Sequence, residues 1–253
     1  MLIAQISDSH IDPESDKIED RLRDLRCVVN DINSLDPNPN IVIHTGDVVH
    51  NGTQKKYDLA LTILGDIQAP LHVCPGNRDD RKLISRNFQT GRDISPGSKF
   101  LQYSIDDHPV RLIALDTLSA TTNMGDYSRA RADELRQLLV EEPQKPTVLF
   151  MHHPPFEIVS SKYPFQFDDW DTVDHLTDVL KNQTQVQHLF CGHTHRNSKG
   201  EIVGIPASTV PSIATDLRLG DFPKGAEFSP VYHIHKFDGT RFKSKTVVCR
   251  VLE

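Results

Sequence analysis

The sequence LIAQISDSH, residues 2–10, is a short apolar run that ends abruptly in polar residues. An uncharged apolar run of this length is typical of a buried strand. Apolar residues then recur at helical spacing from Ile18 to Ser34, and the proline-containing stretch Asp36–Asn40 ends that helix. The start of the chain therefore predicts a strand followed by a helix, which is the first half of a βαβ unit.

The same order repeats further along the chain. Ile41–Ile43 predicts a second buried strand, a helix is expected near Gln54–Ile67, and Leu71–Cys74 predicts a third strand. Two later apolar runs, Thr147–Met151 and Val186–Phe190, predict further strands of the same kind. Strands that alternate with helices favour an α/β fold with a largely parallel sheet.

The remaining segments complete a single predicted domain over residues 1–253. We expect an antiparallel hairpin over residues 100–115 and a helix at Arg129–Val140. The chain becomes rich in β-strands from about residue 200, where strands are expected at Glu201–Ile205, Ala207–Ile213, Val231–Phe237 and Ser244–Val251. The long irregular stretch Phe156–Asp171 is expected to form a lid or a subunit contact near the candidate site, although ordinary packing on the sheet is the alternative.

Composition excludes several classes of protein. The formal net charge is −7 and no basic block occurs, which disfavours stable binding to nucleic acid. No apolar run approaches the length of a membrane span, and the N-terminus lacks the basic region of a signal peptide. The four cysteines match neither a metal knuckle nor a disulfide framework, so we expect reduced thiols and a cytoplasmic protein. Whether the chain forms a homo-oligomer stays open.

Polar residues with metal-binding side chains follow the predicted strands. Asp8 and His10 stand two residues apart, as do His193 and His195, and side chains at this spacing point the same way in an extended chain. Single residues follow three other strands; these are Asp47, Asn77 and His152. Ligands of open α/β sheets bind beyond the carboxyl ends of the strands, so we expect these side chains to converge there.

Each of these motifs has an ordinary explanation when it is taken alone, as a turn or as a satisfied histidine. Together they offer three carboxylate or amide oxygens and four imidazoles, which are too many for one tetrahedral ion and suit two ions that share a ligand. Asp47 is the natural shared ligand, because an aspartate can bridge. A set without thiolates favours Mn, Fe, Zn or Co, as divalent or mixed-valence ions. Paired ions of this kind hydrolyse phosphate esters or amides.

The ordered motifs resemble those of the calcineurin-like metallophosphoesterases. The matching stretches are Asp8-Ser9-His10, Gly46-Asp47, Gly76-Asn77-Arg78-Asp79, His152-His153-Pro154-Pro155 and Gly192-His193-Thr194-His195. The resemblance implies an α/β fold with a four-layer αββα double β-sheet sandwich and a metal site at the carboxyl ends of the strands. Residues 206–217 and 229–232 also look like the tail of the bacterial class III cyclic-nucleotide phosphodiesterases and their glycerophosphodiesterase relatives.

The resemblance also implies roles for individual residues. One metal ion would be held by Asp8, His10, Asp47 and His195, and the second by Asp47, Asn77, His152 and His193. A hydroxide that bridges the two ions would attack phosphorus. The implied enzyme is a phosphodiesterase that acts on a small diester, either a cyclic nucleotide such as cyclic AMP or a glycerophosphodiester.

Arg78 departs from the family pattern, which has histidine at this position. Asn77 and Arg78 are the candidate catalytic residues. Arginine keeps a donor for phosphate but does not release a proton at neutral pH, so a neighbouring histidine such as His153 could be needed as the acid. The alternative is that Arg78 forms a salt bridge with Asp79, Asp80 or another acidic residue.

Two other functions stay open. A phosphomonoesterase or a nuclease could use the same pair of ions, although the net negative charge speaks against a nuclease. The chain could also be a metal-stabilised scaffold for protein partners that has lost activity. Loss of activity normally removes metal ligands, and here only Arg78 favours that interpretation.

Overall fold

Two β-sheets lie face to face in the computed structural model, which describes residues 1–88 and 99–249. The five-stranded sheet contains, in spatial order, β11 (Phe242–Val248), β10 (Val231–Phe237), β1 (Leu2–Ile6), β2 (Ile41–His44) and β3 (Leu71–Val73). The six-stranded sheet contains β4 (Tyr103–Ile105), β5 (Arg111–Ala114), β6 (Thr147–Phe150), β7 (Val186–Cys191), β9 (Ile205–Thr209) and β8 (Ser198–Ile202). The centre of each sheet is parallel, and the strands β10, β11, β4 and β8 are antiparallel to their neighbours.

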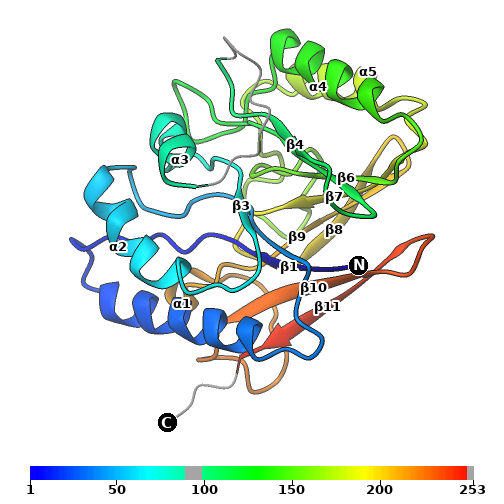
Figure 1. Cartoon of the computed structure of the whole chain (residues 1–253). Coiled ribbons are helices and arrows are strands. Elements are labelled where there is room, and N and C mark those ends of the chain that lie inside the picture. Colours follow the sequence, from blue (N-terminus) through cyan, green and yellow to red (C-terminus); the bar gives the residue numbers. More distant parts are fainter. Residues whose placement is uncertain (89–98, 250–253) are drawn as a thin grey trace.

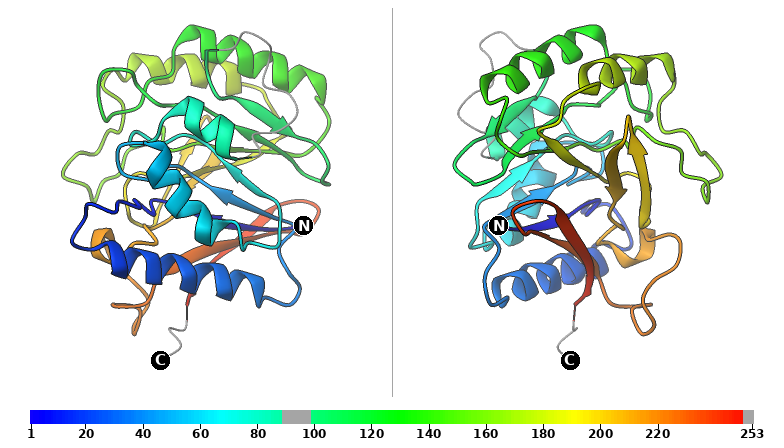
Figure 2. Two further views of the ribbon diagram at one scale, coloured as in Figure 1. Left: turned by 60° about the vertical axis from the view of Figure 1, so that its left-hand side comes forward. Right: turned by 90° about the vertical axis from the view of Figure 1, so that its right-hand side faces the viewer.

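Helices cover the outer faces of both sheets, so the molecule has four layers (Figures 1 and 2). The helices α1 (Ile18–Asn33) and α2 (Gln54–Leu64) lie on the five-stranded sheet, and α3 (Arg81–Asn87) follows β3. The helices α4 (Arg129–Glu141) and α5 (Asp171–Leu180) lie side by side on the six-stranded sheet. The four-layer fold that the family resemblance implies is confirmed.

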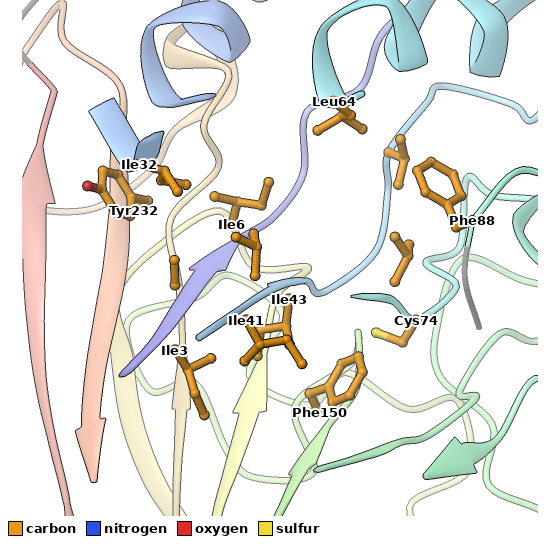
Figure 3. Close-up of a cluster of buried hydrophobic side chains, with 14 of the residues drawn as sticks. Ile3, Ile6, Ile32, Ile41, Ile43, Leu64, Cys74, Phe88, Phe150 and Tyr232 are labelled. Atoms are coloured by element: carbon orange, nitrogen blue, oxygen red, sulfur yellow. The ribbon is translucent and has the colours of Figure 1, made fainter. Parts of the chain in front are cut away.

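Apolar side chains fill the space between the layers because alternate residues of each buried strand point to opposite faces. Ile3, Ile41 and Ile43 lie toward Phe150 of the other sheet, whereas Ile6 lies toward the helices (Figure 3). All of these side chains are fully buried. Burial of one such side chain contributes roughly 1.5–3 kcal/mol, so the cluster holds the two sheets in a fixed relation.

Most of the predicted strands and helices are present, but the first C-terminal strands differ from the prediction. The predicted strands Glu201–Ile205 and Ala207–Ile213 are wrong in their bounds, because the chain turns sharply at Val203 and Gly204 between β8 and β9. Both turn residues have positive φ, which a glycine adopts without strain. Residues 210–213 leave the sheet after β9, and residues 250–251 of the last predicted strand lie outside the described residues.

No helix within residues 1–88 and 99–249 is both long enough and apolar enough to cross a membrane. No disulfide joins any of the four cysteines.

His233 and His235 are buried where β10 faces the six-stranded sheet, and the half-buried His188 of β7 lies near them. The ring of His235 stacks on Phe190 with ring centroids 3.9 Å apart, and His188 stacks on the same phenylalanine at 4.5 Å. His233 lies beside His235. Burial lowers the pKa of His233 and of His188 to about 4, and lowers the pKa of His235 as well. These imidazoles are therefore neutral in the folded protein at pH 7.

Acid is expected to destabilise the fold through these histidines. Below about pH 6.5 the unfolded chain binds protons that the folded chain excludes, so this stability is complete above pH 6.5 and is lost as the pH falls toward 4. When a chelator keeps the protein free of metal, the free energy of unfolding should fall by up to about 1.4 kcal/mol for each such histidine as the pH is lowered by one unit. The unfolding free energy is measured by urea titration at several pH values. His233→Gln should make it depend less steeply on pH, because one of these histidines is gone. Lys236→Gln, at an exposed position of the same strand, is the control, and an equal slope in all three proteins would contradict the prediction.

Candidate metal centre

The loops beyond the strand ends adopt an unusual backbone conformation. Five residues of the predicted site have left-handed backbone angles, with φ of 57° at Asp8, 44° at His10, 54° at Asp47, 68° at His193 and 54° at His195. Residues other than glycine rarely adopt this conformation, which costs roughly 1–2 kcal/mol for each residue. Strain concentrated at one place indicates a functional site, because the surrounding contacts must hold it there.

Backbone hydrogen bonds lock these loops together. The Asp8 amide donates to the Gly46 carbonyl and the His10 amide donates to the Asp47 carbonyl, each at 3.0 Å. Two glycines allow the close approach: a Cβ at Gly46 would lie 2.6 Å from His152 Nδ1, and a Cβ at Gly76 would lie 2.2 Å from Asp47 Oδ1. No other residue fits at these two positions without moving the candidate ligands.

A first cluster of side-chain atoms forms at the ends of β1 and β2. His10 Nε2 lies 3.2 Å from His195 Nε2 and 3.5 Å from Asp47 Oδ2. Asp8 Oδ1 lies 3.2 Å from His195 Nε2 and 3.7 Å from His10 Nε2. Asp8, His10 and His195 thus direct their ligand atoms at one point.

A second cluster forms beside the first. His152 Nε2 lies 3.0 Å from Asn77 Oδ1, 3.2 Å from His193 Nδ1 and 3.5 Å from Asp47 Oδ2. Asp47 Oδ2 is therefore equally distant from His10 and from His152, and it joins the two clusters. All of the residues predicted to hold metal ions lie in one cluster or the other.

The atoms in these clusters are arranged for a cation rather than for each other. In two places one imidazole nitrogen faces another, and at most one of the two can donate a hydrogen. Asp8 Oδ1 is buried and makes no well-aligned hydrogen bond to any described residue. An unpaired buried carboxylate oxygen is costly, and a bound metal ion would satisfy it. The donor set thus fits the pair of ions that the sequence predicts.

Outer hydrogen bonds fix which nitrogen of each histidine faces the clusters. His152 Nδ1 donates to the Thr45 carbonyl at 2.7 Å, and His195 Nδ1 donates to the Leu217 carbonyl at 2.9 Å. The lone pair of Nε2 is then free in each ring. Metal-binding histidines commonly have such a partner, which sets the tautomer and the ring orientation.

The carboxylates and imidazoles of the two clusters shift one another's pKa values. Burial acts to raise the pKa of Asp8 and of Asp47, but the neighbouring histidines outweigh it and both pKa values are lowered. Burial acts to lower the pKa of His152, but Asp47 raises it to about 9. Burial lowers the pKa of His193 to about 3. Two ionised carboxylates therefore lie among the imidazoles, and the carboxylate of Asp47 favours positive charge at the neighbouring His152.

His153 lies against the second cluster but its ring is already occupied. The centroids of the His153 and His193 rings are 4.3 Å apart. His153 Nδ1 accepts a hydrogen bond from Thr117 Oγ1 at 2.8 Å, and Nε2 donates to the Asn123 carbonyl at 3.2 Å. Burial lowers the pKa of this ring. His153 is therefore poorly placed to act as the acid that the sequence analysis suggested.

Arg78 stands at the edge of the site with a side chain that forms no ion pair within the described residues. Its backbone amide donates to Asp47 Oδ1 at 2.7 Å. Asp79 instead accepts from Tyr57 Oη at 2.9 Å, and Asp80 accepts from the first turn of α3. The predicted salt bridge from Arg78 to Asp79 or Asp80 is wrong, and no other acidic residue within residues 1–88 and 99–249 pairs with Arg78. The guanidinium is left available to an anion.

The stretch Phe156–Asp171 reaches the candidate site at Phe167, while a role as a lid or as a subunit contact stays a prediction. Phe167 is buried and its ring centroid is 6.1 Å from that of His153. Phe165 and Trp170 pack on each other at 4.9 Å, and about half of the Phe165 side chain stays exposed.

The sequence did not indicate the helix α5 that begins at Asp171. It also did not indicate the carbonyls of Thr45 and Leu217, because a backbone group carries no sequence signal.

The comparisons with known proteins agree with this geometry. The family model described as calcineurin-like phosphoesterase matches residues 1–197. A probable glycerophosphodiester phosphodiesterase GpdQ of Arcobacter nitrofigilis is 33% identical over 226 residues, which cover 86% of this chain and 82% of the relative. A probable cyclic nucleotide phosphodiesterase of Rhodopseudomonas palustris is 32% identical over 191 residues, which cover 72% of this chain and 66% of the relative.

Solved structures share the fold at low sequence identity. A dimetal phosphatase from Danio rerio has a TM-score of 0.69 and 14% identity, and the match covers 100% of this chain and 97% of that chain. The family uses a dinuclear metal centre, for which the two clusters joined by Asp47 are the candidate ligand groups. The predictions of the family and of an enzyme are confirmed: the chain belongs to the calcineurin-like phosphoesterase family.

Proposed function

We propose that the chain hydrolyses small phosphodiesters with two divalent transition-metal ions. Asp8, His10, Asp47 and His195 would hold one ion, and Asp47, Asn77, His152 and His193 would hold the other. The observation that carries the proposal is the position of Asp47 Oδ2, 3.5 Å from the ligand nitrogen of each cluster. Nitrogen and oxygen donors without a thiolate suit Mn, Fe, Zn or Co.

When bound, such a pair of ions lowers the pKa of a water molecule and offsets the negative charge of the phosphate group. The chain's own residues then have separate tasks. The side-chain amide of Asn77 belongs to the second cluster, where its oxygen can bind an ion and its NH₂ group can donate a hydrogen bond. The positively charged Arg78 guanidinium donates a hydrogen bond to a phosphate oxygen. His50 lies at the rim, where its ring centroid is 5.8 Å from that of His10.

His50 replaces His153 as the histidine that could exchange a proton with the leaving group. Its ring makes no hydrogen bond to a described residue, and the residue is only half-buried. Burial lowers the pKa of His50, and the charges of Arg78 and His10 lower it further. A mostly neutral imidazole is a weak source of protons at pH 7, so departure of a poor leaving group is expected to be slow.

Relatives with both kinds of substrate in their names support a diester as the substrate class. The 33% identical relative is named as a glycerophosphodiester phosphodiesterase, and a Pseudomonas aeruginosa protein that is 26% identical over 205 residues is named as a 3′,5′-cyclic adenosine monophosphate phosphodiesterase. The convergence of all predicted ligands disfavours an inactive scaffold. The single domain and the cytoplasmic location stay predictions, and the oligomeric state stays open.

Removal of both ions is expected to abolish hydrolysis, and Asp47→Asn should bind neither ion tightly, because the shared carboxylate offsets their mutual repulsion. Elemental analysis after dialysis against Mn²⁺ should show two equivalents in the wild type and fewer than one in the variant. Asp178→Asn, which removes an exposed carboxylate paired with Lys181, is the control. Two equivalents bound by Asp47→Asn would contradict the proposed centre.

Diesters are expected to react faster than monoesters. A p-nitrophenyl phosphodiester carries one negative charge and the monoester nearly two, so the monoester needs more positive charge beside the candidate ligands than the single guanidinium of Arg78 offers. The ratio of kcat/KM for bis(p-nitrophenyl) phosphate to that for p-nitrophenyl phosphate should exceed one. A larger kcat/KM for the monoester would favour the phosphomonoesterase alternative.

Replacement of Arg78 is expected to separate phosphate binding from proton transfer. Arg78→Ala should raise KM for every substrate, because a charged donor is lost. Arg78→His should raise kcat for substrates with poor alkoxide leaving groups, by up to roughly 10²–10⁴-fold, and should change p-nitrophenyl esters little. Kinetics on cyclic AMP, a glycerophosphodiester and a p-nitrophenyl diester measure both effects. Unchanged KM and unchanged ratios in both variants would give Arg78 no part in the reaction.

A further inference from the structure

The segment Ser212–Arg218 contacts the candidate metal centre although it lies beyond residues 1–197, the part that matches the family model. It follows β9, leaves the six-stranded sheet and passes the end of β1. The Ile213 amide donates to the Ser7 carbonyl at 3.1 Å, and Ser212 Oγ donates to the Asp8 carbonyl at 2.8 Å. The segment thus holds the backbone at a candidate ligand that has a strained φ of 57°.

The same segment also holds His195 and, through one arginine, His10. The Leu217 carbonyl accepts from His195 Nδ1. Arg21 on α1 donates from Nη2 to Asp216 Oδ2 at 2.8 Å, from Nε to Asp216 Oδ1 at 3.2 Å, and from Nη1 to the His10 carbonyl at 3.0 Å. One guanidinium therefore joins the backbone of a candidate ligand to the residue before Leu217.

This network is well shielded from water. Arg21 is 9% exposed, and the Asp216 side chain is 20% exposed. Two further hydrogen bonds join the segment to α1. Asp24 Oδ2 accepts from the Thr215 amide at 2.9 Å and from Thr215 Oγ1 at 2.7 Å. A guanidinium has a fixed fork geometry that lysine cannot reproduce, so it holds three acceptor atoms in a set arrangement.

The hydrogen bonds of the Arg21 and Asp216 side chains lie at the first cluster, although Asp8 Oδ2 of that cluster accepts from the His193 amide at 3.1 Å. The network contacts all three residues of this cluster. It donates hydrogen bonds to the carbonyls of Asp8 and His10, and it orients the ring of His195. In the second cluster, His152 is oriented by the Thr45 carbonyl, and Asp79 accepts from the Gly76 amide at 2.9 Å beside Asn77. Within the described residues, no hydrogen bond of the Arg21 or Asp216 side chain reaches His152, His193 or Asn77.

We propose that Arg21 and Asp216 are positioning residues that set the affinity of the first metal site and leave the second unchanged. This inference rests on the proposed function, in which the first cluster holds one of the two ions. Neither residue belongs to the ligand set proposed for the two ions. They act by holding the left-handed backbone at His10 and the ring of His195 in the conformation that a metal ion requires, so less of the binding free energy is spent on ordering the ligands.

The test is a titration of the full chain with Co²⁺ after a chelator has removed bound metal. Binding is measured by calorimetry and, in parallel, by the visible absorption of the bound ion. The wild type should bind two equivalents. Arg21→Lys and Asp216→Asn should weaken one of the two binding steps by about 10–100-fold and leave the other within twofold of the wild type. Arg23→Lys is the matched control, because Arg23 lies on the same helix and pairs with Asp20 at 2.8 Å on the exposed surface.

The outcomes separate this inference from the proposed function. Two unchanged binding steps in both variants would overturn the role of Arg21 and Asp216 while the dinuclear centre stands. Equal weakening of both steps would also overturn it, because the effect would then be a general loss of structure. A wild type that binds fewer than two ions would overturn the proposed centre and the inference together. Thermal melts of the stripped proteins report folding, and Asp216→Asn, the milder change, decides the test if Arg21→Lys does not melt cooperatively.

Discussion

The buried carboxylate of Asp47 imposes the strictest requirement on the molecule. An ionised carboxylate that is nearly excluded from water must be surrounded by donors or cations, or it destabilises the fold by several kcal/mol. Oδ1 accepts from the Arg78 amide, and Oδ2 faces His10 and His152. These partners come from the ends of β3, β1 and β6, so strands of both sheets must end at the same place to satisfy one residue.

Much of the remaining architecture serves that arrangement. The apolar contacts among Ile3, Ile41 and Phe150 fix one sheet against the other, so distances between groups on different sheets stay constant. The glycines at 46 and 76 let two loops approach within van der Waals contact of the candidate ligands. The energy stored in the left-handed residues is offset by this rigid surrounding, since a loop of the same sequence free in water would relax to ordinary φ values.

The sequence predicted the candidate ligands better than it predicted the turns and hydrogen-bond partners that surround them. Asp8 with His10 and His193 with His195 could be paired because side chains alternate in extended chain, and the strand ends could be located from apolar runs. The turn at Val203 was missed because a β-branched residue seldom adopts positive φ, so the pattern continued the strand through it. The roles of His153 and Arg78 depended on which neighbouring groups were already bonded. Such information comes from tertiary contacts, and no spacing rule contains it.

The central place of β1 in its sheet has a consequence for the order in which the protein is made. β1 pairs with β2 on one side and with β10 on the other, and Leu2 lies opposite Lys236. A nascent chain that already contains every candidate ligand, up to His195, still lacks the strand that completes this sheet and the carbonyl of Leu217 that orients the last histidine. Contacts between residues so far apart in sequence form late, because the intervening loop must close first. The first cluster therefore gains its full set of contacts only when a segment that follows every candidate ligand in the sequence has folded against it.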